Sequence, residues 1–189
     1  MSDAQQEIRW VLRAQVGDRE AFEKLLKSVE QPLFRYVSSL VATKHLAEDI
    51  LQEVFVGIYR KLRWLREPEL FRAWTYRIAT REAFRQLKRQ RKWQDHIDEN
   101  ATLEAVASPE SGQGFVPGSF TKLPEWIARI STASRAVIVL HFLHEMTLEE
   151  VGAVLGIPIG TVKSRLAYGL QCLRRFRLEA DELPNRRIT

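Results

Sequence analysis

Residues 147–170 read TLEEVGAVLGIPIGTVKSRLAYGL, and this stretch carries the clearest structural signal in the chain of 189 residues. Thr147 followed three residues later by Glu150 is a capping box, which marks the start of a helix. Gly156 suits the turn that ends that helix, and Pro158 favours the start of the next one. The stretch therefore predicts two helices joined by a short turn.

The second of these helices has one apolar and one polar face. Its apolar stripe repeats at helical spacing and consists of Val162, Leu166, Leu170 and Leu173. The polar side chains near its N-terminal end lie mostly outside that stripe: Thr161, Lys163, Ser164 and Arg165. In a helix-turn-helix, such positions meet base edges and phosphates in the major groove. We therefore predict a helix-turn-helix in which these four residues bind duplex DNA.

The first ninety residues also follow helical periodicity. Gly17 and Asp18 suit a helix end and the N-cap of the next helix, and Pro32 suits a helix start or a bend. The clearest apolar repeat then follows, and a further helix is predicted from about residue 69 to 91. Every fourth residue in that repeat is aliphatic: Ile50, Val54, Ile58 and Leu62. We find no convincing strand alternation, so the predicted fold class is all-α.

Between about residues 93 and 122 the helical pattern fails. The run SPESGQGFVPGS (residues 108–119) is rich in Gly, Ser and Pro, which is typical of a flexible linker. We predict two small helical domains, residues 1–93 and 122–189, joined by a linker at residues 94–121.

Charge is unevenly distributed along the chain, whose formal net charge is +5. Residues 72–92 hold eight basic side chains and one acid, and residues 163–177 hold five basic side chains and no acid. Residues 93–122, between them, hold five acids and one base. Two basic blocks on predicted helices indicate two surfaces that face a polyanion.

Composition also bears on compartment and on catalysis. The single cysteine, Cys172, excludes an internal disulfide framework and reads as a packing thiol. The N-terminus lacks the apolar core of a signal peptide, and no apolar run has membrane-spanning length. We therefore expect a cytoplasmic protein. No Gly-rich phosphate loop is present, and we expect neither enzymatic activity nor a cofactor.

One alternative is a metalloenzyme, because His141, His144 and Glu145 in HFLHE share one helical face. The spacing differs from the H-E-x-x-H of zinc proteases, and neither a cysteine pair nor a third ligand cluster accompanies it. Two histidines at the end of an apolar helix are more often surface or packing residues. We therefore predict no metal site.

The segment GIPIGTVKSRL (residues 156–166) resembles the recognition segment of region 4 in bacterial RNA polymerase sigma factors. Two earlier segments resemble region 2: LAEDILQEVFVGIYRKL (residues 46–62) and FRAWTYRIATREAFRQLKRQRK (residues 71–92). Their order and spacing are similar to the extracytoplasmic-function (ECF) group, which lacks the domain between these regions. The resemblance implies that the chain binds core RNA polymerase and directs initiation at promoters.

The resemblance also implies roles for particular residues. The helix-turn-helix would contact the −35 element, and the loop at residues 63–69 corresponds to the family segment that captures an extruded base. The resemblance implies that four residues dock on the polymerase clamp: Asp49, Gln52, Glu53 and Phe55. Acids near a helix start also stabilise its dipole, so this group has a purely structural alternative. An anti-sigma factor is a further partner that the resemblance leaves open.

The −10 element is assigned to the helix that begins near residue 71. A cationic stripe spans an arc of about 80° on it, at 100° per residue, and suits a phosphate backbone: Arg77, Arg81, Arg85, Lys88 and Lys92. Trp74 and Tyr76 precede it and either stack on unpaired bases or pack in the core. Arg81 stands where many family members have asparagine, which leaves the −10 base preference open.

A second alternative is a helix-turn-helix regulator that binds DNA without being a polymerase subunit. Such a regulator needs a receiver or ligand-binding domain, and the first ninety residues show no parallel-sheet pattern from which to build one. The sigma-factor interpretation is therefore preferred.

Overall fold

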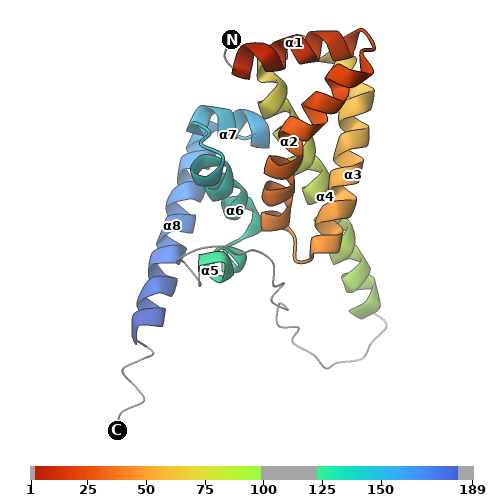
Figure 1. Ribbon diagram of the computed structural model, residues 1–189. Coiled ribbons are helices and arrows are strands. Elements are labelled where there is room, and N and C mark those ends of the chain that lie inside the picture. Colours follow the sequence, from red (N-terminus) through yellow and green to blue (C-terminus); the bar gives the residue numbers. More distant parts are fainter. Residues whose placement is uncertain (1–2, 99–122, 183–189) are drawn as a thin grey trace. The chain divides into compact units, whose positions relative to one another are not determined.

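The computed structural model of the chain describes residues 3–98 and 123–182, and every regular element in them is a helix (Figure 1). This confirms the all-α prediction. The chain divides into two compact units, Met1–Glu110 and Ser111–Thr189, which we call unit 1 and unit 2. Within the described residues, no helix has both the length and the apolar character that crossing a membrane requires.

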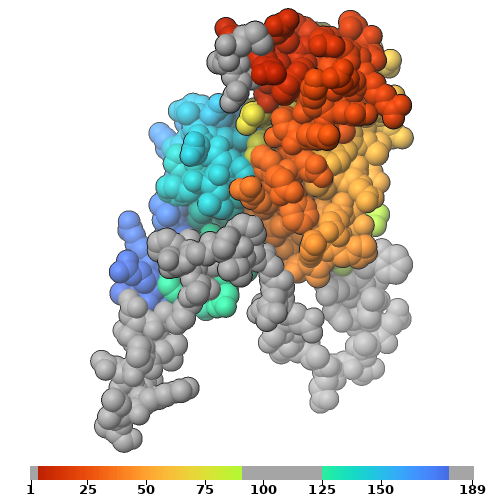
Figure 2. All heavy atoms as spheres, viewed as in Figure 1, coloured from red at the N-terminus to blue at the C-terminus, as the bar shows by residue number. Residues whose placement is uncertain are grey.

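The described part of unit 1, residues 3–98, contains four α-helices and two short 3-10 turns. The α-helices are α1 (Asp3–Gln15), α2 (Arg19–Leu40), α3 (Lys44–Lys61) and α4 (Phe71–Asp98). The 3-10 turns η1 (Leu62–Trp64) and η2 (Pro68–Leu70) connect α3 to α4. Helix α2 packs against the other three helices, and its fully buried Leu25, Leu33 and Tyr36 form the centre of the core. The side chains of α1 and the start of α2 cover one end of this unit (Figure 2).

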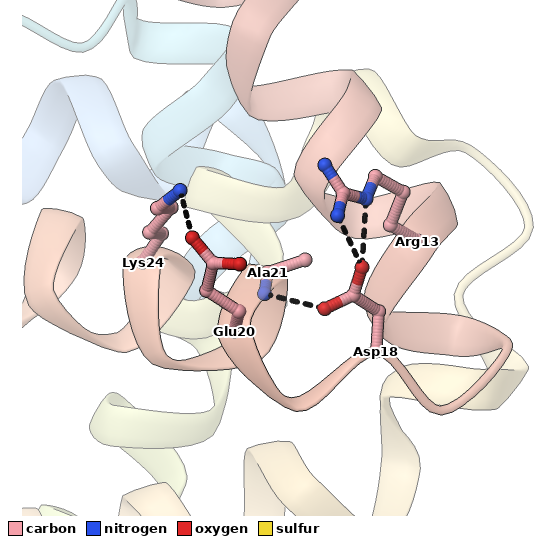
Figure 3. Close-up of polar contacts among 5 residues, drawn as sticks. All are labelled: Arg13, Asp18, Glu20, Ala21 and Lys24. Atoms are coloured by element: carbon pink, nitrogen blue, oxygen red, sulfur yellow. Dashed lines mark hydrogen bonds and ion pairs between the residues drawn. The ribbon is translucent and has the colours of Figure 1, made fainter.

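The α1–α2 corner is built from local interactions. Gly17 has φ +97°, which suits glycine, and the Asp18 carboxylate caps α2 by accepting from the Ala21 N–H at 3.0 Å. Arg13 pairs with Asp18 at 2.6 Å (Figure 3). The Ala21 N–H and Arg13 together hold the pKa of Asp18 below its usual value. The predicted helix end and N-cap are confirmed here.

Two features of unit 1 narrow the sequence prediction. Of the two roles predicted for Pro32, a helix start or a bend, the first is wrong, because Pro32 lies inside α2, which is helical on both sides of it. Helix α4 continues to Asp98, beyond its expected end near Arg91. Most of the predicted linker, from residue 99 onward, lies outside the described residues.

Unit 2 contains α5 (Leu123–Arg129), α6 (Thr132–Ile138), a π-helical turn η3 (Val139–Leu143), α7 (Leu148–Leu155) and α8 (Ile159–Glu182). Helix α8 contacts α5, α6 and α7. Part of its core consists of buried Ile130, Ile138 and Phe176, against which Cys172 packs while half-buried. Cys172 is therefore a packing thiol, as predicted.

Candidate nucleic-acid interface

Helices α7 and α8 form the predicted helix-turn-helix. Both halves of the capping box are present: Thr147 Oγ1 accepts from the Glu150 N–H at 3.2 Å, and Glu150 Oε2 accepts from the Thr147 N–H at 2.8 Å. Gly156 ends α7 in the left-handed conformation, with φ +66°. A Cβ added at Gly152 would lie 3.1 Å from the Ile157 carbonyl oxygen, so the turn folds closely over α7. The left-handed Gly156 and the close approach at Gly152 thus determine how α8 follows α7.

The four predicted −35 residues lie on the first two turns of α8. Lys163 and Ser164 are exposed, Thr161 and Arg165 are half-buried, and Val162 between them is fully buried. The Ser164 hydroxyl donates to the Thr161 carbonyl at 3.0 Å. The first turns of α8 therefore present hydroxyl groups and cations together, the groups that contact base edges and phosphates.

One candidate DNA-contacting residue on α8, Tyr168, was not identified from the sequence. Tyr168 lies four residues after Ser164 and is 56% exposed. Residues four apart share a helix face, and this spacing is the signal that would have found it. Tyr168 extends the candidate DNA-contacting surface by one turn.

The histidines of the metalloenzyme alternative lie at the π-helical turn. His141 Nδ1 is 2.7 Å from the Met146 carbonyl oxygen. Within the described ranges, no three His, Cys, Asp or Glu side chains gather closely enough to hold a metal ion. The contact with Met146 gives His141 a structural role at this turn, and no observation on the described residues favours a metal site.

The predicted polymerase-docking residues share helix α3, which Thr43 caps through the Leu46 N–H. Asp49, Gln52 and Glu53 are exposed, whereas Phe55 is half-buried. His45 Nε2 lies 3.9 Å from Asp49, one helical turn away. The exposed acids form a surface that a basic partner can reach.

Four members of the cationic stripe on α4 are exposed: Arg77, Arg81, Arg85 and Lys88. The side chain of Lys92 lies outside the described residues. One acid interrupts the stripe, since Glu82 accepts from Arg85 Nη2 at 2.6 Å and from Arg85 Nε at 3.0 and 3.2 Å. This carboxylate raises the pKa of the Arg85 guanidinium, and it occupies donors that a phosphate would otherwise use.

Tyr76 is not at the surface, which corrects its assignment to base stacking. It is 5% exposed, and its ring packs edge-on against Tyr36 with centroids 5.4 Å apart. Burial raises the pKa of Tyr76 to about 12. A side chain that is 5% exposed cannot stack on a base without leaving the core, so Tyr76 is left out of the candidate interface.

Trp74 and Trp64 differ from Tyr76. Trp74 is half-buried, with its ring centroid 6.3 Å from that of the buried Phe71. Trp64, in the loop between α3 and α4, is 69% exposed, and the Arg63 guanidinium lies 4.7 Å from its ring centroid. Sequence reasoning did not name Trp64, although its position in the loop at residues 63–69 could have indicated it. Trp64 is thus an exposed aromatic ring of the loop that can stack on an unpaired base.

Each unit matches a family of known proteins. The family described as Sigma-70 region 2 matches residues 25–93, and the family described as Sigma-70, region 4 matches residues 126–175. The ECF RNA polymerase sigma factor SigW of Bacillus subtilis (strain 168) is 30% identical over 169 residues, which cover 84% of this chain and 90% of SigW. The chain belongs to the ECF sigma factors.

Other relatives agree with this sigma-factor assignment. The ECF RNA polymerase sigma-E factor of Escherichia coli (strain K12) is 29% identical, over 82% of this chain and 86% of its own. Among solved structures, the sigma factor RpoE in complex with the anti-sigma factor NepR, from Bartonella quintana, is 25% identical with a TM-score of 0.65, over 82% of this chain and 94% of that one. CnrH, in complex with the cytosolic domain of CnrY, shares the fold with a TM-score of 0.67 at 24% identity, over 93% of this chain and 99% of that one.

Membership in this family confirms the resemblance seen in the sequence. The region 2 match covers most of α2 and all of α3, and it ends within α4; the region 4 match extends from α5 into α8. As an ECF sigma factor, the chain directs promoter-specific initiation with RNA polymerase, rather than regulating transcription independently of it. Helix α1 precedes both matched regions.

Proposed function

We propose that the two units of this sigma factor recognise different promoter elements. Unit 2 holds the −35 duplex through the polar end of α8, with Lys163 and Ser164 exposed to the groove and Thr161 and Arg165 at its flanks. The N-terminal end of the helix that follows the turn is the part that enters the major groove in helix-turn-helix proteins. Tyr168 lies at the groove edge, one turn further along α8.

Unit 1 binds and helps to open the −10 region. The exposed cations of α4 follow the backbone of one strand: Arg77, Arg81, Arg85 and Lys88. The exposed Trp64 in the adjacent loop offers a face to an unpaired base, and half-buried Trp74 lies at the start of α4. Strand separation then uses binding energy, since stacking requires an unpaired base and the phosphate contacts hold the strand that carries it.

Core polymerase binds the exposed acids of α3, Asp49 and Glu53, together with Gln52 and the half-buried Phe55. Glu53 also acts electrostatically on Arg85 of the cationic stripe, so the proposed docking residues and the stripe meet where α3 packs on α4. We also propose that an anti-sigma factor binds this chain, as NepR does RpoE in the related structure. The protein acts in the cytoplasm as a dissociable subunit, without a cofactor or catalytic activity of its own.

The observation that carries the proposal is the pairing of a complete helix-turn-helix in unit 2 with an exposed cationic helix in unit 1. The test is footprinting of promoter DNA by core polymerase reconstituted with this chain. Lys163→Ala and Arg165→Ala should weaken protection of the −35 element and leave the fold intact. A base-contacting arginine costs about 1–3 kcal/mol and relaxes specificity, whereas a phosphate contact weakens all sequences alike. Unchanged −35 protection in both variants would count against the placement of α8.

A further inference from the structure

Helix α1 contacts the loop between α3 and α4, and one of its side chains bonds two carbonyl groups there. Gln15, the last residue of α1, donates its amide N–H groups to the carbonyl oxygen of Leu62 at 3.0 Å and to that of Leu65 at 2.7 Å. These partners lie 47 and 50 residues away in sequence. They are the carbonyls that flank Arg63 and Trp64, the stacked pair of the loop.

The two carbonyls need such a donor because α3 ends there. The carbonyls in the last turn of a helix have no helical partner, and η1 supplies only one bond, from the Leu65 N–H to the Leu62 oxygen at 3.0 Å. Leu65 itself is extended, with φ −72° and ψ 108°. Gln15 therefore occupies the second lone pair of Leu62 and bonds Leu65 where the chain leaves the 3-10 turn.

The other end of the loop is held from the same helix. Glu7, which is 8% exposed, accepts from Arg72 Nε at 2.9 Å, and Arg72 is the second residue of α4. Glu7 and Gln15 lie eight residues apart, about 12 Å along a helix. Helix α1 also contacts both η1 and η2 and lies across the end of the bundle where α3 ends and α4 begins (Figure 1).

We propose that α1 is a splint that fixes the shape of the α3–α4 loop for capture of an unpaired −10 base, with Gln15 and Glu7 as positioning residues. This rests on the proposed function, because it requires unit 1 to bind the melted strand. Neither residue touches DNA. Each acts through the backbone or side chain at one end of the loop, and so sets where Trp64 is presented.

Gln15→Glu tests the splint, because it keeps the shape of the side chain and removes both donors. Gln6→Glu is the matched control: the same substitution on the same helix, at an exposed residue that is not one of the loop contacts. Gln15→Leu removes the donors without adding charge, and Gln15→Lys restores a donor. Each full-length variant is assembled with core polymerase and presented with single-stranded DNA randomised across the −10 positions, and the bound strands are sequenced.

We expect Gln15→Glu and Gln15→Leu to reduce the preference at one −10 position by about fivefold or more, since each lost hydrogen bond is worth roughly that factor. Gln6→Glu should keep the preference, and Gln15→Lys should recover much of it. Affinities for −35 duplex and for core polymerase should stay unchanged in all four variants. Amide hydrogen exchange should quicken at residues 62–70 in the first two variants and stay unchanged in the centre of α2.

Retained base preference in both Gln15→Glu and Gln15→Leu would overturn the splint. A uniform loss of affinity for every sequence would do so as well, because that is the result of a merely structural role. If the wild-type chain itself shows no preference among single strands, the proposed −10 function fails together with the splint. If the wild type discriminates and the Gln15 variants discriminate equally, only the splint fails.

Discussion

Glu82 competes with DNA phosphate for Arg85 in the cationic stripe on α4, and removing its charge should strengthen DNA binding. The Glu82 side chain is only 15% exposed and holds Arg85 through contacts at 2.6, 3.0 and 3.2 Å. A phosphate that binds Arg85 must displace this carboxylate. Glu82→Gln keeps the size of the side chain and removes its charge, so Arg85 becomes available and the local repulsion of the strand ends.

The size of the effect follows from the number of charges. One additional phosphate contact steepens the dependence of log K on log salt by about 0.7 for a single strand. A unit charge a few ångströms away in water changes a binding constant by about fivefold, and salt reduces this further. We therefore expect an affinity gain of about threefold at low salt, which shrinks as salt is added.

Fluorescence anisotropy with a labelled single strand, across a salt series, measures both quantities. The change in salt slope should vanish and the gain should shrink when Glu82→Gln is made in an Arg85→Ala background, because no cation is then left to release and only the loss of repulsion remains. Glu30→Gln, which removes the charge of an exposed acid on α2, controls for net charge alone. If Glu82→Gln leaves the slope and the affinity unchanged while the circular dichroism spectrum matches wild type, α4 does not bind the strand through Arg85.

Three further predictions follow from the same structure. Gly156→Ala should destabilise unit 2 by about 1–2 kcal/mol, because φ +66° is left-handed, and Gly156→Asn should destabilise it less. Chemical denaturation measures both variants, and an alanine variant as stable as wild type would contradict backbone strain at residue 156. Burial raises the pKa of Tyr36, and that of Tyr76 to about 12, whereas the phenols of the unfolded chain ionise near pH 10. Above about pH 10 the folded state therefore binds more protons than the unfolded state, and the free energy of unfolding should fall as pH rises. Urea unfolding at rising pH should show this fall in the wild type and not in a Tyr36→Phe, Tyr76→Phe variant. Charge reversal of Asp49 and Glu53 together should weaken binding to core polymerase in a competition assay and spare isolated −35 duplex; normal core binding would reduce these acids to stabilisers of α3.

Local signals in the sequence predicted the helix-turn-helix well. The Thr147–Glu150 box and the left-handed Gly156 are interactions between residues close in the chain, and the structure contains each of them. Asp18 and Gly17 were predictable for the same reason. Helix starts and stops of this kind depend on a few neighbouring residues and not on the rest of the fold.

Contacts between distant residues were not predictable in this way. Trp74 and Tyr76 lie two residues apart on α4, and Tyr76 is buried because α4 packs on other helices, where its ring contacts Tyr36 of α2. The bonds from Gln15 to Leu62 and Leu65 leave no local pattern at all. Sequence therefore predicted which helices carry the candidate site, and the packing of helices decided which of their side chains are exposed.

The most direct test of the central claim is transcription in vitro from genomic DNA by core polymerase with and without this chain, followed by sequencing of RNA 5′ ends. The account predicts a set of start sites that appear only when the chain is added and that share two upstream elements at a fixed spacing. Lys163→Ala with Arg165→Ala should lower transcription from those same sites. Transcription that the chain leaves unchanged, or new starts without a shared pair of elements, would contradict the assignment.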